Sequence, residues 1–331
     1  MLLGETLNAA IKRLEVKGVP SPRLNAELLL MFTLGHDRAY LYGHPERELT
    51  SEEQSQYDQV LAQRSQGIPA QYITGHQEFW GMDLIVSPAV LIPRPETEHV
   101  VEAVLERVEG RFDPSKSRVG RTFLSDKNAR NKATLIASTS RESATRAGAP
   151  APHVRIVDVG TGSGCIALAV AKELAHAEIH ATDISPAALE IARANAARHQ
   201  LAHRIQFHES DLLRGIEKNS FDFVVSNPPY VGESEEDTVQ LEVRKFEPRT
   251  AVFAGATGTE VIERLIPQAR EVLKPGGWLI MEISGTIAER VRELLNDWKD
   301  VEIAKDLQGI PRVASAQNRR AVARSRDYFV L

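Results

Sequence analysis

The fold class of this chain is decided by the stretch Arg155-Ile156-Val157-Asp158-Val159-Gly160-Thr161-Gly162-Ser163-Gly164. Its first five residues form a mostly apolar run that predicts a buried strand, and a helical pattern begins at Ile166. Glycines between a strand and a helix allow a tight turn and let a ligand approach the backbone. The dinucleotide-binding fingerprint also needs a glycine at its sixth position, which is Cys165 here. The loop therefore argues against a dinucleotide dehydrogenase and favours a cofactor without a pyrophosphate, such as S-adenosylmethionine.

Strands and helices alternate after this loop, and this alternation is typical of a mostly parallel α/β sheet. The expected strands are 155–159, 178–182, 205–207, 221–225 and 278–283, with edge strands at 301–303 and 328–330. The expected helices between them are 166–174, 186–199 and 260–273. We therefore predict an α/β domain with a Rossmann-like sheet.

Residues 1–75 are predicted to form a small N-terminal helical bundle. Apolar residues recur at helical spacing in segments that begin near Leu3 and Leu24, and prolines separate the two. Thr50 and Glu53 form a capping-box pattern that opens a third long helix. No catalytic motif falls in this region, so the bundle is interpreted either as a structural cap or as a domain that docks a partner.

A β-hairpin within residues 76–98 is expected to link the bundle to the α/β domain, which then covers 99–331. Its strands are predicted at 79–86 and 89–92, with the turn at Ser87-Pro88. A helix carrying a run of valines follows.

Composition restricts the class of protein. The chain has 331 residues, a formal net charge of -5 and a single cysteine, Cys165, which fits a reducing compartment. No signal peptide or apolar run of membrane-spanning length is present, so a cytoplasmic protein is expected. The acidic balance argues against a dedicated duplex-DNA binder. Residues 113–150 are basic and poor in large apolar side chains, so we interpret them as a disordered insertion.

Carboxylates follow the second and third strands of the predicted sheet. Asp183 is placed to accept the hydroxyls of a ribose, because Ser185 is the better cap for the helix that follows. Asp211 is placed to accept an adenine amino group, with Leu212 packing on the ring. Asp183 could instead cap the helix, and Asp211 could be a surface carboxylate.

The motif Asn227-Pro228-Pro229-Tyr230 directly follows the expected strand 221–225. Ligands of open α/β sheets bind beyond the carboxyl ends of the strands. The Asn227 side-chain carbonyl and the Pro228 backbone carbonyl can both accept hydrogen bonds from one planar NH2 group. The two prolines stiffen the backbone and remove N–H donors, and Tyr230 offers an aromatic face to a flat substrate. The motif indicates methyl transfer to a planar nitrogen, with no metal site.

With these motifs the chain resembles the peptide chain release factor N5-glutamine methyltransferases (the PrmC/HemK family). The matching stretches are 69–75, 78–81, 91–98, 158–168, 226–230, 247–249 and 274–277. The Ile-Pro-Arg-Pro-Glu-Thr-Glu segment at 92–98, together with the helical N-terminus, is the most specific of these features. The insertion at 113–150 is not part of the family pattern.

The resemblance implies a class I S-adenosylmethionine-dependent methyltransferase that modifies the glutamine of the Gly-Gly-Gln motif of class I release factors. It implies that Asn227, Pro228 and Tyr230 hold the glutamine amide. It implies that the cofactor is held by Gly160, Thr161, Gly162, Ser163, Gly164, Asp183, Asp211, Leu212 and Asn227. The segment around Arg94 and Glu96 would line the entrance to the site, and the N-terminal helices would help to dock the release factor. A monomer that needs no direct nucleic-acid contact is expected.

Two other readings stay open. The substrate could be a ribosomal-protein glutamine or the N6 amino group of adenine in a nucleic acid, since these enzymes share the same active-site logic. The chain could instead be a non-catalytic cofactor-binding or ribosome-associated module, which an intact glycine loop beside an intact Asn-Pro-Pro-Tyr motif makes less attractive.

Overall fold

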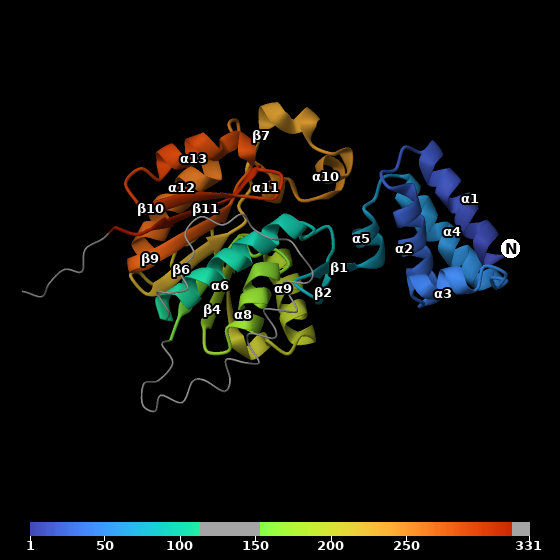
Figure 1. The fold of residues 1–331 in the computed structure, drawn as a ribbon, viewed down its shortest axis with the longest axis horizontal. Helices are drawn as coiled ribbons and strands as arrows, with labels where there is room; N and C mark the ends of the chain where they lie inside the picture. Colours follow the sequence, from blue (N-terminus) through green and yellow to red (C-terminus); the bar gives the residue numbers. More distant parts are fainter. Residues whose placement is uncertain (113–152, 320–331) are drawn as a thin grey trace, which may run out of the picture.

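The computed structural model describes residues 1–112 and 153–319 (Figure 1). The expected insertion at 113–150 and the expected strand at 328–330 lie outside these described residues. Within them, none of the helices is both long enough and apolar enough to cross a membrane.

The N-terminal region is a helical bundle with its own apolar core. Its helices are α1 (Leu3–Val16), α2 (Pro22–Leu34), α3 (Arg38–Gly43), α4 (Ser51–Ser65) and α5 (Ala70–Thr74). Buried leucines from α1 and α2 pack around Tyr57 of α4, whose hydroxyl donates to the Ala26 carbonyl over 2.9 Å. The predicted capping box is confirmed, because Thr50 and Glu53 each accept a hydrogen bond from the other's backbone N–H. The short helices α3 and α5 were not predicted.

The structure contains the predicted linking hairpin, but the position predicted for its turn is wrong. Its strands are β1 (His76–Phe79) and β2 (Met82–Ile85), and Phe79 pairs with Met82. The turn residues Trp80 and Gly81 have φ values of 54° and 67°. Positive φ at both positions of a two-residue loop matches the twist of the flanking strands. The expected turn at Ser87-Pro88 therefore lies beyond the hairpin, and 89–92 forms no strand.

The α/β domain is built on a seven-stranded sheet in the order β10-β11-β9-β6-β3-β4-β5. Its parallel strands are β3 (Arg155–Val159), β4 (Glu178–Asp183), β5 (Ile205–Glu209), β6 (Phe221–Ser226) and β9 (Leu273–Glu282). The chain moves from β3 outward to β4 and β5, then returns to add β6 on the other side of β3. The crevice between β3 and β6 is therefore the topological switch point, where ligands of such sheets bind.

Helices cover both faces of the sheet (Figure 1). One face carries α6 (Glu98–Phe112), α8 (Cys165–Glu173) and α9 (Pro186–Arg198), and the other carries α12 (Glu260–Val272) and α13 (Ala288–Leu294). Alternate residues of β3 enter the two cores, with Ile156 on the first face and Val157 and Val159 on the second. This sandwich explains why the parallel strands are apolar on both sides.

The last two strands differ in part from expectation. The strand β10 (Lys299–Lys305) forms the sheet edge, as expected for 301–303. A further antiparallel strand, β11 (Pro311–Gln317), inserts between β10 and β9 and was not predicted. Its short alternating pattern, Val313-Ala314-Ser315-Ala316, carries too few large apolar residues to be recognised as an interior strand.

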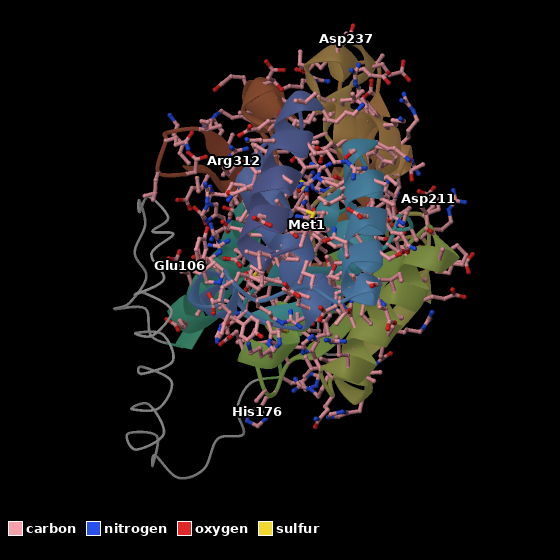
Figure 2. The ribbon with its side chains drawn as sticks, turned by 90° about the vertical axis from the view of Figure 1, so that its right-hand side faces the viewer. Met1, Glu106, His176, Asp211, Asp237 and Arg312 are labelled. Carbon is pink, nitrogen blue, oxygen red and sulfur yellow. The ribbon has the colours of Figure 1, made fainter. Side chains whose placement is uncertain are left out.

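Short elements between β6 and α12 connect the two parts of the molecule. They are β7 (Val231–Gly232), η4 (Glu233–Thr238), α10 (Leu241–Phe246), α11 (Arg249–Val252) and β8 (Phe253–Gly255). The buried guanidinium of Arg64 in α4 pairs with Glu242 of α10 and also binds Asn25 and the Ile68 carbonyl. Figure 2, viewed from the bundle, shows the N-terminal helices in front of the α/β domain. The bundle is therefore tied to the segment that follows the Asn-Pro-Pro-Tyr motif.

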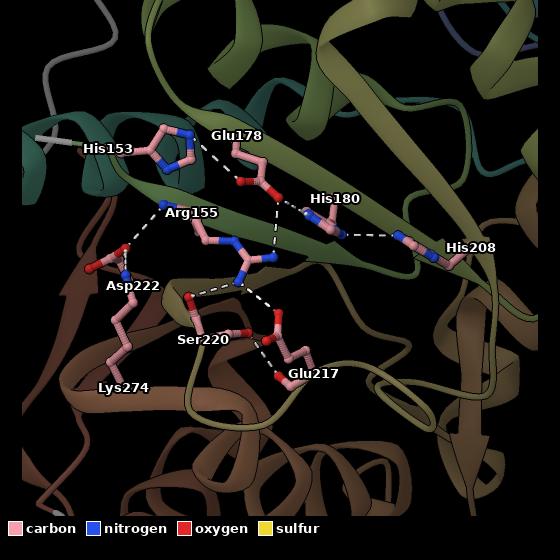
Figure 3. A network of polar contacts seen from close by, with 9 residues as sticks. All are labelled: His153, Arg155, Glu178, His180, His208, Glu217, Ser220, Asp222 and Lys274. Carbon is pink, nitrogen blue, oxygen red and sulfur yellow. Dashed lines mark hydrogen bonds and ion pairs between the residues drawn. The ribbon is translucent and has the colours of Figure 1, made fainter.

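A polar network joins the strands β3, β4 and β5 (Figure 3). The Arg155 guanidinium pairs with Glu178 at 3.1 Å and with Glu217 at 2.9 Å. Glu178 also contacts His180, which lies against His208 with 3.0 Å between ring nitrogens. The hydrogen bond with His180 lowers the pKa of Glu178. The ion pairs of Arg155 with Glu178 and Glu217 thus fasten the end of the sheet opposite the glycine loop.

Candidate active site

The glycine loop leaves β3 for α8 in the left-handed region, with φ of 68° at Gly160, 55° at Gly162 and 84° at Gly164. A Cβ at Gly160 or Gly162 would meet no atom within 4 Å, so the backbone there is open to an approaching group. A Cβ at Gly164 would lie 3.3 Å from the side chains of Ala192 and Leu168. The first two glycines thus leave room for a ligand, while the third lets α8 and α9 pack closely.

The residues between the glycines hold the loop from within. Thr161 Oγ1 donates to Asp158 Oδ2 over 2.6 Å, and Ala167 N donates to the same oxygen over 3.2 Å. The side chains of Thr161 and Ser163 are buried, so the loop offers a ligand its backbone rather than these hydroxyls. Burial raises the pKa of Asp158 to about 7, although both hydrogen bonds oppose the rise. Sequence reasoning gave Asp158 no role.

Asp183 lies beside the glycine loop at the end of β4. Its Oδ2 accepts from Gly162 N and its Oδ1 from Ser185 N, both over 2.9 Å. Ser185 Oγ accepts from Ala188 N over 3.2 Å, which confirms Ser185 as the cap of α9. Burial raises the pKa of Asp183. The Asp183 carboxylate beside the open glycine backbone can accept hydrogen bonds from the hydroxyl groups of a ligand.

Asp211 and Leu212 follow β5 and are brought to the same edge of the sheet. Ser210 N donates to the Asp183 carbonyl over 2.9 Å, which joins the ends of β4 and β5. The Asp211 carboxylate forms an ion pair with Arg264 of α12 through Oδ2. Leu212 has a φ of 58° and packs partly against the second core. Asp211 is thus a paired carboxylate whose second oxygen could serve a ligand.

The Asn-Pro-Pro-Tyr motif begins where β6 ends, next to the glycine loop. Ser226 Oγ donates to the Val159 carbonyl over 2.7 Å and joins the ends of β6 and β3. Asn227 Nδ2 donates to Thr97 Oγ1 over 3.0 Å, so its Oδ1 is the end of the amide that can accept. Pro228 is buried and Pro229 is half-buried, and Tyr230 lies partly against the second core.

One buried carboxyl group contacts this motif, and another holds the segment before Thr97. The Tyr230 hydroxyl donates to Glu282 Oε1, at the end of β9, over 3.0 Å. Burial is the largest cause that raises the pKa of both Tyr230 and Glu282. Glu247 accepts from Ile92 N over 3.1 Å and forms an ion pair with Arg94. The segment that carries Thr97 is therefore fixed to the loop that follows α10.

Comparisons with known proteins identify the relatives of this chain. The family model described as the PrmC N-terminal domain matches residues 5–75, and the methyltransferase small domain matches residues 146–245. The release factor glutamine methyltransferase of Koribacter versatilis (strain Ellin345) is 50% identical over 314 residues, which cover 95% of this chain and 97% of that protein. The protein of that name from Rhodopirellula baltica is 36% identical, with 91% of each chain covered. The chain belongs to the release factor glutamine methyltransferase family.

Among solved structures, the N-terminal domain of human METTL16 in complex with SAH is 16% identical, with a TM-score of 0.46 over 87% of this chain and 91% of that one.

In this member of the release factor glutamine methyltransferase family, sequence reasoning missed four polar residues of the site. They are Thr97, Asp158, Glu247 and Glu282. The first three lie inside stretches that match the family pattern. The match therefore identified these segments but assigned no role to the three residues. Glu282 ends an apolar strand, and a lone carboxylate after such a run is the signal that could have found it.

Proposed function

We propose that this protein methylates the N5 nitrogen of the glutamine in the Gly-Gly-Gln motif of class I peptide chain release factors, using S-adenosylmethionine. One observation supports this most. The Asn-Pro-Pro-Tyr motif and the open glycine loop lie at the ends of adjacent parallel strands, joined by the bond from Ser226 to the Val159 carbonyl. A substrate nitrogen at the motif and a cofactor on the loop would share one crevice.

The cofactor supplies a methyl group already activated on a positively charged sulfur. The backbone of the loop 160–164 would receive its amino-acid part. Asp183 would accept hydrogen bonds from the ribose hydroxyls, and Asp211 with Leu212 would receive the adenine. Burial raises the pKa of Asp158 to about 7, so this carboxyl carries less negative charge beneath the loop than an ordinary aspartate would.

The motif would position the glutamine amide. Asn227 Oδ1 and the Pro228 carbonyl would each accept one N–H of the substrate amide. These two hydrogen bonds fix the position of the nitrogen and increase the electron density on it. Pro229 stiffens the turn, and the Tyr230 ring contacts the planar amide. Positioning accounts for most of the rate, since holding two reactants in line removes a large entropic barrier.

The domains are assigned roles accordingly. We propose that residues 1–75 dock the release factor, that 76–98 link the parts, and that 99–331 carry out the transfer. The ion pair from Arg64 to Glu242 supports docking near the site, because it ties the bundle to the loop that follows the motif. We place the protein in the cytoplasm as a monomer that needs no direct nucleic-acid contact.

The test is methyl transfer from labelled S-adenosylmethionine to a purified class I release factor, beside its Gln→Ala variant in the Gly-Gly-Gln motif. Label on the wild-type factor alone is expected. Label on neither factor, but on a ribosomal protein or an RNA offered in parallel, would replace this substrate with one of the alternatives.

A further inference from the structure

The helix α10 lies between the N-terminal bundle and the segment that contacts Asn227. Figure 1 shows α10 on the side of the α/β domain that faces the bundle. Glu242 is near the start of this short helix, and Glu247 follows its last residue as the C-cap. These two carboxylates bind different parts of the molecule, so α10 can connect one part to the other.

The start of α10 is anchored to the bundle by Arg64. The Arg64 side chain is 3% exposed and forms an ion pair with Glu242. The same guanidinium donates to Asn25 Oδ1 over 2.7 Å and to the Ile68 carbonyl over 3.1 Å. Because the bundle already holds this planar group in place, little side-chain freedom is lost when it pairs with Glu242.

The end of α10 contacts the bundle and also holds the segment 92–97. A Cβ on Gly67 would lie 3.5 Å from the ring of Phe246, the last residue of the helix. The next residue, Glu247, is buried. Its carboxylate accepts from Ile92 N over 3.1 Å and forms an ion pair with Arg94. The position of α10 therefore fixes the start of this segment.

The segment 92–97 ends at the catalytic amide. Thr97 N donates to the Arg94 carbonyl over 3.1 Å, so the backbone between these two residues forms a tight turn. Thr97 Oγ1 accepts from Asn227 Nδ2 over 3.0 Å. A continuous series of hydrogen bonds, ion pairs and short backbone stretches thus runs from the bundle to Asn227.

We propose that Glu247 is a positioning residue that fixes the segment 92–97 and, through it, the side chain of Asn227. This inference rests on the proposed function. Because Arg64 anchors α10, the bundle supports the catalytic amide in addition to docking the substrate protein. The effect on turnover can be large, since a displacement of about 1 Å at a positioning group can cost 100-fold in rate.

Docking and positioning change different kinetic constants. Weaker docking raises KM for the release factor, whereas a misplaced Asn227 lowers kcat even when the release factor is saturating. Glu247→Gln keeps the shape and an acceptor but removes the charge that pairs with Arg94. Arg64→Met removes the anchor from the bundle side, and Glu242→Ala removes the same ion pair from α10 if Arg64→Met does not fold.

Tyr57→Phe is the matched control, because the buried Tyr57 hydroxyl donates to the Ala26 carbonyl within the bundle and does not contact α10. Single-turnover and steady-state methylation of a class I release factor would be measured for each variant. We expect Glu247→Gln to lower kcat about 10-fold, and Arg64→Met or Glu242→Ala about fivefold. Tyr57→Phe should stay within about twofold of the wild-type kcat, and KM for S-adenosylmethionine should change by less than about twofold throughout.

Double variants distinguish positioning from a general loss of stability. Residues that act in series are not additive, so adding Arg64→Met to Glu247→Gln should lower kcat by less than about a further twofold. The effect of Glu247→Gln should also fall below about twofold in a Thr97→Val background, where the contact with Asn227 is already lost. Full additional losses in these double variants overturn the inference, as does a wild-type kcat in Glu247→Gln or an effect confined to KM for the release factor. Absence of transfer by the wild-type protein would instead refute the proposed function.

Discussion

Asn195 of α9 is a polar side chain that fastens the linking hairpin to the glycine loop. It is fully buried, and its Oδ1 accepts from Ile85 N over 2.6 Å. Its Nδ2 donates to the Ile85 carbonyl and to the Ser163 carbonyl, each over 2.9 Å. Replacing Asn195 with Ala would leave three backbone groups without these partners.

The magnitude follows from the burial of each contact. The bond to Ser163 is buried, and loss of its donor leaves an unsatisfied carbonyl that costs about 1–3 kcal/mol. The two bonds to Ile85 are partly buried and contribute about 1 kcal/mol each. Alanine recovers about 0.5 kcal/mol through its helix propensity. Asn195→Ala should therefore lower the free energy of unfolding by about 3 kcal/mol.

Urea unfolding monitored by circular dichroism would measure this loss. A fall in melting temperature of about 6–12 °C should accompany it. Glu190→Ala is the matched control, because Glu190 is exposed on the same helix. Isothermal titration should also show weaker binding of S-adenosylmethionine, since Asn195 holds the loop at Ser163. A variant as stable as Glu190→Ala would refute the reasoning.

Three further predictions concern the catalytic amide, a buried carboxylate and the insertion. Asn227→Ala should lower turnover at least about 100-fold with little change in cofactor affinity, as expected for one positioning group, and unchanged turnover would contradict its assignment. Asp158 has a pKa near 7 in the folded protein and near 3.8 unfolded, so folding binds protons between these values and stability contributed by this group falls as pH rises from about 4 to 7. Asp158→Asn should remove about 3 kcal/mol of that decline between pH 4.5 and pH 7.5, measured by urea unfolding at both values, and parallel pH profiles would contradict it. Deleting 116–148 should leave the melting temperature unchanged within about 2 °C, because that composition buries little apolar surface, and a large drop would show that the segment packs on the core.

The sequence predicted the parts of the site that are contiguous in the chain. The glycine loop and the Asn-Pro-Pro-Tyr motif each directly follow an apolar strand, so the rule for parallel sheets places them at one edge. The bond from Asn227 to Thr97 spans 130 residues, and that from Tyr230 to Glu282 spans 52. Such contacts depend on how elements pack, and no local pattern encodes them.

The fold, like the site, was predicted correctly where a local pattern encodes it and missed where it depends on packing. Long periodic segments were recognised, including the capped helix α4. The hairpin turn was misplaced because Trp80 adopts a positive φ, which a bulky aromatic residue rarely does. The apolar run from Phe79 hid a break in the middle of a predicted strand. The strand β11 escaped because its small residues gain their burial only from the neighbours β9 and β10.

The helix α6 and the strand β3 give the chain a place to accept foreign sequence. The helix starts beside Thr97 and ends 15 residues later at Phe112, about 22 Å along its axis. The strand begins at Arg155, about 16 Å before the glycine loop. Both attachment points of the intervening residues are thus remote from the chemistry. An affinity tag or fluorescent domain inserted between these attachment points should therefore leave the crevice open. For the same reason, we expect changes in the length of this segment to have little effect on catalysis.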